Sequence, residues 1–475
     1  MYTKSAVGDE NDKDDKRRKA PPTSRFGRLA RLGALAPKAI PFAAEALRRA
    51  VQRKPDTEVE DEESKRKMVE SVKNASDAML KTLGEMKGLP LKFGQMASYI
   101  DGIAPPGFED KFQESLKKLQ QKAPPLDPEA ARQVISAELG ALPEALFQSF
   151  EREPFAAASI GQVHRAITKE GAAVAVKVQY PGIDKAIEAD LKSVSVLESV
   201  ISPLGRRYHT KETLEELRTV FMAELDYREE AETTALFRRL HEDNPNIVIP
   251  QVFHDLSTRR VLTTELMGGQ DYATFAQEAS QAERDAACVT IWTFMCKSLF
   301  QYGLLYADPH PGNYRFLGGG RVAFLDFGCR RLLPPELVLG MKSYIIAAMD
   351  GDWPLFQERI TKVLGYDPED KAGYPLYIDY SKMLLEPLTR DGNYQHTKEA
   401  AREAVAFLVR GSRKAFIKED GSLPDLPKPI NMPTEFTFVS RLQWGLASVM
   451  GGLGGEGNYR RLSEDWIRSP VLPLP

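Results

Sequence analysis

The sequence predicts an α+β fold of two lobes, in which a part rich in strands precedes a mainly helical part. The chain has 475 residues, which is long enough for two or more packed lobes. Residues 154–180 include an alternating, β-branched run typical of strands, whereas apolar residues recur at helical spacing from 67 to about 150 and again beyond 336. Residues 303–330, which precede the last helices, combine a Pro/Gly-rich loop with a short apolar strand.

The composition is that of an ordinary globular protein, with 42% hydrophobic and 28% charged residues. A net charge of -3 gives no reason to expect nucleic acid as a partner. Cys288, Cys296 and Cys329 lack metal-binding spacing and suit a reducing compartment, and we expect the first two to be buried in one helix. No apolar run reaches about 18 residues and the start lacks an apolar signal core, so we expect a cytoplasmic protein without a transmembrane helix.

The first 65 residues differ in character from the rest. Residues 1 to about 23 are charged, and we expect them to be disordered. Residues 25–54 contain many Arg and Lys and a single acid, Glu45. This basic amphipathic stretch is either a solvated helix packed loosely on the body or a peripheral contact with an anionic membrane. An acidic run then marks a boundary near residue 65.

Helical spacing predicts a helical domain at residues 66–150. It contains the short sequence K-F-G-Q, which places Lys92 and Gln95 on either side of a glycine. Alone, such a sequence is also compatible with an ordinary helix start that carries a surface lysine.

The strand run at 154–180 resembles the nucleotide-binding part of a protein kinase. Such an enzyme covers the phosphates with G-x-G-x-x-G-x-V and contacts the α and β phosphates with the lysine of V-A-I-K. Here V-A-V-K ends at Lys177, and only the third glycine of the loop is present, as Gly161. Alanines replace the first two and restrict φ, so we expect a stiffer loop. The expected nucleotide-binding residues here are Ala156, Ala157, Ala158, Ser159, Gly161, Val163 and Lys177.

An acidic helical segment follows at residues 183–242. Two of its glutamates could pair with Lys177: Glu198, at ordinary kinase spacing, and Glu230, in a second acidic run that also holds Glu224 and Asp226. Because most acids in such a helix are solvated, composition does not choose between them.

Two strands are then expected between residues 247 and 266, where a kinase passes from its small to its large lobe. Backbone groups there read adenine, so Glu265 and Met267 are candidate nucleotide contacts. A long apolar helix from Asp285 to Tyr302 would support the loop that follows.

That loop carries the polar side chains on which the chemistry depends. Asp308 and Asn313 are five residues apart in a Pro/Gly-rich loop that we expect to be neither helix nor strand, and a Gly318–Gly320 turn then precedes a strand ending near Asp326. The kinase catalytic loop has the same Asp-to-Asn spacing, and residues 326–328 are a literal D-F-G. In a kinase the first Asp lies near the acceptor, and the Asn and second Asp bind Mg²⁺. We therefore expect Asp308 to be catalytic and Asn313 and Asp326 to be metal ligands.

Beyond Gly328 the chain enters helices that we expect to reach about Gly451, and the last residues are not expected to fold. The predicted domains are 1–65, the helical extension 66–150, a strand-rich lobe 151–266 with inserted helices and a mainly helical lobe 267–475.

Taken together, the motifs resemble the UbiB/ADCK (AarF-domain) family of atypical protein-kinase-like ATPases. They are K-F-G-Q at 92–95, A-A-A-S-I-G-Q-V-H at 156–164, V-A-V-K at 174–177, E-L-D-Y at 224–227, A-D-P-H-P-G-N at 307–313 and D-F-G at 326–328. They cover roughly residues 67 to 330 in the family's order, which makes the resemblance specific.

The resemblance implies an atypical protein-kinase-like two-lobe fold whose N-terminal helical extension carries the KxGQ motif over the active site. It implies that Lys92 and Gln95 meet Glu224 and Asp226 there as a regulatory clamp, with Lys92 as an additional catalytic residue. It also implies that Glu230 rather than Glu198 pairs with Lys177. Implied cofactors are ATP and Mg²⁺, and implied partners are prenyl lipids, quinone precursors and enzymes of quinone biosynthesis. A homodimer is a further candidate.

The residue types at and after the Asp308 loop reduce the number of possible activities. Tyr306 and Ala307 replace the His and Arg of H-R-D, and only five residues separate Gly328 from Pro334, where a protein kinase has a long activation segment. We therefore favour a Mg²⁺-dependent ATPase or a kinase acting on a small molecule or lipid. A conventional protein kinase and a non-catalytic nucleotide-sensing scaffold are the alternatives.

Overall fold

The computed structural model describes residues 128–158, 160–189, 222, 224–371, 373–404, 407, 432, 433 and 435–475. The expectations for residues 1–65, for the basic stretch 25–54, for most of the helical extension and for Lys92, Gln95, Ser159 and Glu198 lie outside these residues. The chain divides into two compact units, and within the described residues the first consists of 128–189 and 256–263 and the second of 222–255 and 264–475.

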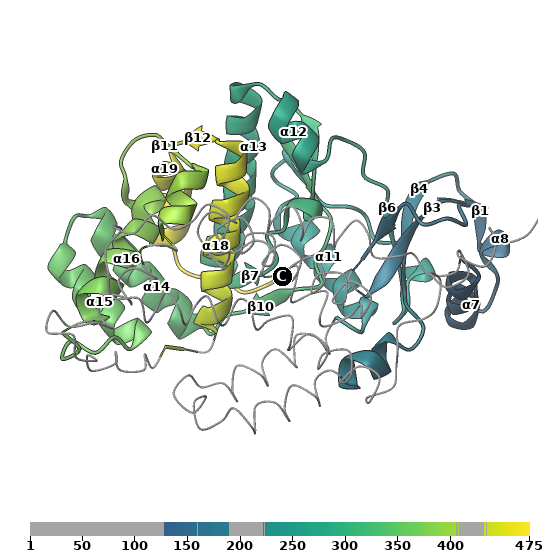
Figure 1. Ribbon diagram of the computed structural model, residues 1–475, viewed down its shortest axis with the longest axis horizontal. Helices are drawn as coiled ribbons and strands as arrows, with labels where there is room; N and C mark the ends of the chain where they lie inside the picture. Colours follow the sequence, from purple (N-terminus) through teal and green to yellow (C-terminus); the bar gives the residue numbers. More distant parts are fainter. Residues whose placement is uncertain are drawn as a thin grey trace, which may run out of the picture. The chain divides into compact units, whose positions relative to one another are not determined.

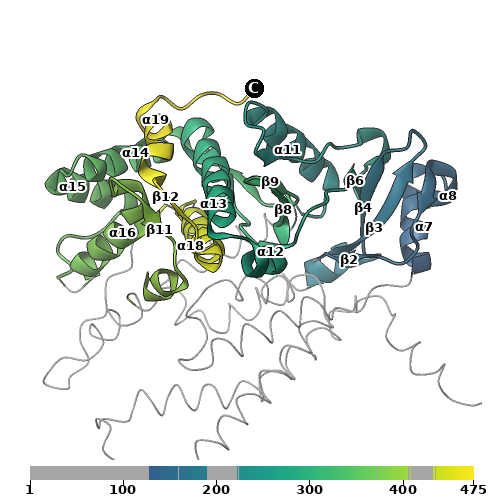
Figure 2. The same ribbon diagram turned by 90° about the horizontal axis from the view of Figure 1, so that it is seen from above.

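The first unit is built on a sheet with the strand order β1-β3-β4-β6, in which β2 also pairs with β3 (Figures 1 and 2). The strands are β1 Phe147–Phe150, β2 Ala156–Ala157, β3 Gly161–Thr168, β4 Ala173–Gln179 and β6 Val261–Glu265. Strand β4 has one buried face, because Val174, Val176 and Val178 are buried while the residues between them are not. Helix α7 (Pro128–Leu139) packs against β4.

The predicted helical segment ends earlier than expected. A short helix, α8 (Pro143–Leu146), is followed directly by β1, so that the residues from Phe147 to Phe150 form a strand. The reason is long-range pairing, since Phe147 lies opposite Thr168 of β3 and Phe150 lies opposite Ala166. Tertiary pairing overrides helical spacing in so short a run.

The middle of the second unit consists of helices and short strands around the loop that contains Asp308 and Asn313. Its helices are α11 Tyr227–Leu240, α12 Tyr272–Glu278 and α13 Gln281–Cys296, which continues into a π-helical turn, η3 Lys297–Gln301. Its strands are β5 Ile247–Val248, β7 Leu304–Tyr306, β8 Tyr314–Gly318, β9 Arg321–Phe324 and β10 Arg330–Leu332. As expected, Cys288 and Cys296 are both buried in α13.

The rest of the second unit is mainly helical, as the sequence predicts. The elements are α14 Pro335–Met349, α15 Trp353–Leu364, α16 Gly373–Thr389, β11 Tyr394–Gln395, α18 Phe436–Leu453, β12 Glu456–Gly457 and α19 Tyr459–Arg468. Figures 1 and 2 show α13 and α18 side by side. The prediction that helices stop near Gly451 is wrong, because Asn458 caps a further helix, α19, whose Ile467 and Ser463 are buried.

Within the described residues, no helix combines the length and the apolarity that crossing a membrane requires. The contacts group α11 with the second unit. The three predicted domain boundaries stay predictions.

Candidate active site

Asn313 and Asp326 are brought together by one β-hairpin in the second unit. Strand β8 begins directly after Asn313, β9 ends at Phe324, and Tyr314 lies opposite Phe324 in their antiparallel pairing. The backbone N–H of Leu325 donates to the carbonyl oxygen of Asn313 at 2.9 Å. Gly318, Gly319 and Gly320 all have positive φ, which the tight turn between the strands requires.

The loop before the hairpin fixes the orientation of the Asn313 amide. Its Nδ2 donates to the carbonyl oxygen of Asp308 at 3.0 Å, so the amide oxygen, which is the atom that a metal would bind, lies on the other side of the group. The loop was expected to be neither helix nor strand, but Pro311–Asn313 forms one turn of 3-10 helix. His310 stabilises this turn, because its Nδ1 accepts from the N–H of Gly312 at 2.7 Å.

Asp308 is held by a residue that the sequence analysis did not identify, Arg441 of α18. Nη2 of Arg441 donates to Oδ1 of Asp308 at 2.8 Å, and Nη1 lies 3.9 Å from the sulfur of Cys329. The two charged side chains are 21% and 17% exposed. Burial opposes the charge of Arg441, but neighbouring Cys329, Asp308 and Glu224 raise its pKa above the usual value. The guanidinium is therefore a permanent cation beside the candidate catalytic carboxylate.

A signal for Arg441 was present in the sequence. It is the single charged residue in the apolar helix α18, and a lone charge in such a helix indicates a buried partner. The partner itself is 133 residues away in the chain and belongs to no local motif.

Helix α18 also approaches the catalytic loop closely. A Cβ placed on Gly445 would overlap the ring of Pro309, which directly follows Asp308. Arg441 and Gly445 are four residues apart and therefore share one face of the helix. This face rests on the loop, and it places the Arg441 guanidinium at Asp308.

The acids of the E-L-D-Y segment lie at the start of helix α11, with Glu224 in the turn before it and Asp226 directly before its first residue. Asp226 is its N-cap and accepts from the backbone N–H of Arg228 at 3.1 Å, while the Arg228 guanidinium donates to both of its carboxylate oxygens. Glu230, one turn into the helix, is buried.

Glu230 and Asp326 both lie close to Gly328. A Cβ placed on Gly328 would lie 3.3 Å from Oδ1 of Asp326 and 3.5 Å from Oε2 of Glu230. The N–H of Gly328 donates to Oδ1 of Asp326 at 3.0 Å. The glycine thus lets two carboxylates approach one stretch of backbone, and its N–H orients one of them.

An aromatic cluster anchors the D-F-G segment to α11 and α13. The ring of Phe327 is buried 5.1 Å from Phe237 of α11, 5.6 Å from Tyr306 and 6.4 Å from Phe294 of α13, measured between centroids. Edge-to-face contacts of this kind add to the apolar area that the rings bury. Tyr306 is the residue that replaces the histidine of H-R-D, so an apolar contact occupies that position.

In the first unit, Lys177 lies on β4 directly opposite Val163 of β3. Strand β2 folds back on β3, so that Ala156 pairs with Val163 and the N–H of Ala158 donates to the carbonyl oxygen of Gly161 at 2.8 Å. The alanine-rich loop is therefore a tight hairpin next to the lysine strand. Whether Glu230 or Glu198 pairs with Lys177 stays a prediction.

The candidate adenine contacts lie at the end of β6. The N–H of Glu265 is already used, since it donates to the carbonyl oxygen of Gln251 at 2.8 Å. Among the described residues, the N–H of Met267 has no such partner. Met267 is thus the more suitable of the two to donate to a nucleobase.

No long segment follows D-F-G. Cys329 is buried, and β10 begins at Arg330 and pairs with β7, with Leu332 opposite Leu304. Helix α14 starts three residues later. The stretch in which a protein kinase would dock a peptide is a short strand tied to the core.

The residues fit a magnesium ion bound together with a nucleotide. No cluster of three or more acidic, His or Cys side chains that could enclose a metal occurs in the described part of the chain. Mg²⁺ does not need one, because it commonly takes one or two carboxylates and completes its shell with water and phosphate oxygens. The carboxylate of Asp326 and the amide oxygen of Asn313, whose backbones the hairpin brings together, meet that requirement.

Comparisons with known proteins identify relatives of this chain. A model of the ABC1 atypical kinase-like domain matches residues 118–360. The mitochondrial atypical kinase COQ8B of Rattus norvegicus is 31% identical over 403 residues, which cover 83% of this chain and 74% of that protein. The mitochondrial atypical kinase COQ8 of Saccharomyces cerevisiae is 28% identical over 414 residues, which cover 86% of this chain and 80% of that protein.

Among solved structures, the Rv3197–erythromycin complex from Mycobacterium tuberculosis is similar in fold. Its TM-score is 0.60 at 26% sequence identity, and the match covers 86% of this chain and 100% of that one.

Proposed function

Because this chain belongs to the ABC1 atypical kinase-like family, which is the UbiB/ADCK family, we propose that it is a Mg²⁺-dependent ATP-binding kinase or ATPase that supports ubiquinone or other prenyl-lipid metabolism. The α+β, atypical kinase-like fold predicted from the sequence is confirmed. The acceptor, in this proposal, is a small molecule, a lipid or water rather than a protein in trans.

The observation that carries the proposal is the arrangement around Asp308. Arg441 holds the Asp308 carboxylate at 2.8 Å, and the Asn313 amide donates to the Asp308 backbone at 3.0 Å. One hairpin then keeps Asn313 beside Asp326. Phosphoryl transfer depends mainly on positioning and on charge, and such a set of oxygens supplies both.

Each residue has a separate role in this proposal. Asp308 accepts a hydrogen bond from the attacking hydroxyl or water and orients it. Asn313 and Asp326 hold Mg²⁺, which when bound neutralises charge on the phosphates. Lys177 contacts the α and β phosphates, and Ala156–Val163 cover them. Met267 and Glu265 contact the adenine, and Glu230 orients Lys177.

Arg441 makes Asp308 a weak base, because a fixed cation beside a carboxylate favours its ionised form. A weak base suits phosphoryl transfer, where bond making to the nucleophile is little advanced and orientation matters more than proton removal.

The short link after D-F-G favours a non-peptide acceptor. Strand β10 pairs with β7 almost at once, so the chain offers no activation segment on which a peptide could lie. A conventional protein kinase remains the alternative, and phosphorylation of a generic peptide is the observation that would favour it.

We also propose that Lys92 and Gln95 are clamped by Glu224 and Asp226, so that the helical extension covers the site. Glu224 is buried near Arg441, and Asp226 is fixed as the N-cap of α11. Lys92→Ala should then alter the rate of ATP hydrolysis or the nucleotide preference, rather than only weaken ATP binding.

The function is tested with purified full-length protein. Phosphate release is measured with Mg-ATP, with ATP and EDTA, and with Mg-ATP plus a generic peptide. We expect phosphate release that requires Mg²⁺. We expect no transfer of phosphate from ATP to the peptide. Thermal stabilisation by Mg-ATP without any turnover under lipid-containing conditions would support the scaffold instead.

A further inference from the structure

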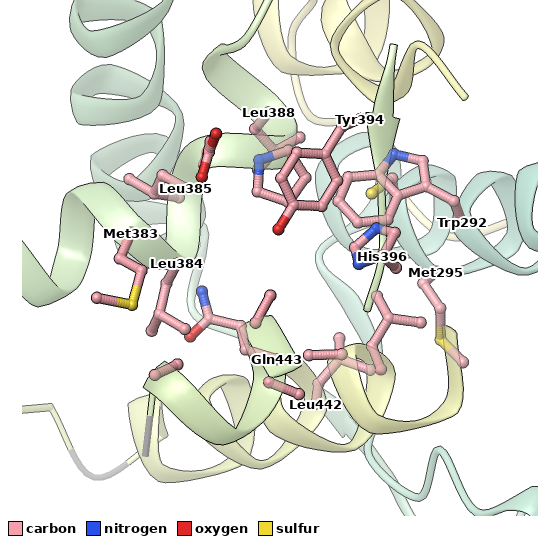
Figure 3. A pocket seen from close by; sticks show the side chains of 18 of the residues that line it. Trp292, Met295, Met383, Leu384, Leu385, Leu388, Tyr394, His396, Leu442 and Gln443 are labelled. Atoms are coloured by element: carbon pink, nitrogen blue, oxygen red, sulfur yellow. The ribbon is translucent and has the colours of Figure 1, made fainter. Parts of the chain in front are cut away.

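The second unit contains a large apolar cavity apart from the candidate active site. Its volume is about 310 Å³, and none of the site residues lines it. The walls come from α13, η3, α14, α16, β11 and α18, and Figure 3 shows Tyr394 and His396 on one side with Met383 and Leu384 on the other. Volumes of this order are typical of sites for small organic ligands.

The wall contains a buried polar atom without a partner. His396 is 6% exposed, and its buried Nε2 has no hydrogen-bond partner among the residues that the structure describes. Burial lowers the pKa of His396 to about 3, so the ring is neutral at pH 7. A buried polar atom without a partner costs free energy, and such an atom in a cavity wall indicates that something else binds there.

The ring of His396 is rigidly placed. Its centroid lies 4.9 Å from that of Tyr394, 4.8 Å from Tyr459 and 5.7 Å from Trp292. The backbone N–H of His396 donates to the carbonyl oxygen of Gly455 at 3.1 Å. Figure 3 shows a ring nitrogen of His396 and the hydroxyl of Tyr394 facing the cavity. Two polar groups therefore meet at one end of an apolar space.

The charges in the wall exclude some ligand classes. Among the described residues, the charged ones that line the cavity are Glu386 and Glu403, both acidic. Glu386 is paired with Arg390 at 3.6 Å. Since the described part of the wall contains no cation, a carboxylate or phosphate would meet no partner there, which is costly. An uncharged ligand avoids that cost.

The cavity is also adaptable. Met295, Met341 and Met383 line it, and unbranched thioether chains adjust readily to a ligand's shape. Leu299 and Phe300 come from the π-helical turn η3, and π-turns occur frequently at functional sites. A second cavity of about 230 Å³ shares Tyr344, Leu384, Leu385 and Gln443 with the first, so the apolar lining continues beyond it.

We propose that this cavity binds an elongated, uncharged apolar molecule with one hydroxyl group, which hydrogen-bonds to His396 and Tyr394. A single water molecule could hydrogen-bond to His396, but it would not fill the apolar part of the cavity. The proposal does not depend on the phosphoryl-transfer function, since no active-site residue takes part.

Binding is tested with the full-length protein and the neutral fluorescent probe N-phenyl-1-naphthylamine. The probe is displaced by 1-decanol, by methyl decyl ether and by decanoate. We expect decanol to displace it at a concentration about tenfold lower than the ether, which corresponds to one net hydrogen bond. Decanoate should be the weakest of the three.

Two variants, each with a control variant, assign the site. His396→Phe keeps an aromatic ring but removes the acceptor, so decanol and ether should become equal. His254→Phe changes an exposed histidine of the same unit and should leave the tenfold difference intact. Ala447→Phe places a ring in the cavity from α18 and should remove probe binding. Leu339→Phe, at an exposed position of α14, should not. Thermal unfolding confirms that each variant is folded.

Three results would each overturn the proposal. They are the absence of probe binding to the wild type, equal displacement by all three competitors, and full probe binding by folded Ala447→Phe.

Discussion

At the Asp308 carboxylate, two roles are compatible with the contact to Arg441. Asp308 could orient the phosphoryl acceptor, or it could only neutralise a cation that α18 brings into the unit. The 2.8 Å ion pair is expected in both cases. The roles differ in what is lost when the carboxylate is replaced, so a pair of variants can separate them.

We predict that Asp308→Asn lowers ATP turnover by about 100-fold or more, as expected for the loss of the group that accepts the hydrogen bond of the attacking hydroxyl or water. Stabilisation by Mg-ATP should persist. The single change also removes the negative charge that is hydrogen-bonded to Arg441, which should cost roughly 1–3 kcal/mol because both side chains are mostly buried. Phosphate release and thermal unfolding measure the two effects.

The double variant Asp308→Asn with Arg441→Gln decides between the roles. It should recover most of the stability but none of the turnover if Asp308 acts on the acceptor. Recovery of both would show that Asp308 is structural.

Asp326→Asn is expected to act on binding instead. The substitution keeps an oxygen for the N–H of Gly328, so the local fold should survive. It removes the negative charge that faces the metal, so the Mg²⁺-dependent part of the ATP-induced thermal shift should disappear. Asp352→Asn, which changes the N-cap of α15, is the matched control. An undiminished magnesium effect in Asp326→Asn would rule out the assignment.

Sequence could predict that Asn313 and Asp326 lie together, because the two residues flank a single hairpin with a glycine turn. It could not predict the contact of Asp308 with Arg441, which joins residues 133 apart. Nothing local in the loop specifies its partner, and only the packing of α18 against the loop brings the two together.

At the scale of the element, α18 has two faces with different surroundings. Arg441 and Gly445 lie against the catalytic loop. Leu442, Gln443 and Leu446 line the apolar cavity. The helix therefore borders both the candidate active site and the proposed ligand site.

We predict that Gly445→Val lowers turnover by about 10- to 100-fold, because the added side chain would overlap Pro309 and displace α18 from Asp308. Binding of Mg-ATP should change little, since Asn313 and Asp326 are held by the hairpin. Ser448→Val introduces the same side chain three residues along the helix and serves as control. Turnover equal to that of the control would mean that the loop accommodates the side chain and that the close approach has no catalytic role.

Element prediction succeeded where local patterns were strong. The alternating valines of β4 and the apolar α13 were visible in the sequence. It failed at β1, where four residues within a helical pattern pair with β3 instead. It also stopped too soon at α19, whose polar sequence hides a buried face formed by Tyr459, Ser463 and Ile467.

At the scale of the whole molecule, the family and the α+β kinase-like fold followed from motifs in a fixed order. The apolar cavity could not be predicted in this way. Its walls come from residues between Trp292 and Ala447. Helical spacing predicts that these residues are buried, but it does not show that a cavity remains between them.

Two deeply buried histidines should make the molecule sensitive to acid. Burial lowers the pKa of His241 to about 3, with nearby Lys297 adding to the effect, and burial alone lowers the pKa of His396 to about 3. An unfolded histidine takes up its proton near pH 6.5. Between pH 6.5 and 3 the unfolded chain therefore binds protons that the folded chain does not, so stability is full above this window and falls as the pH decreases through it.

We predict that lowering the pH from 7.5 to 5 destabilises the protein by up to about 2 kcal/mol for each of these histidines, in addition to the effect of other groups. Replacing one histidine isolates its contribution to this loss of stability, because the contributions of all other groups cancel when the variant is compared with the wild type. His396→Phe should therefore lose less stability on acidification than the wild type. Thermal unfolding at both pH values measures the difference. If His396→Phe and the wild type show the same fall in melting temperature, the buried imidazole takes up a proton without unfolding, and its environment must be wetter than the aromatic contacts of Trp292, Tyr394 and Tyr459 imply.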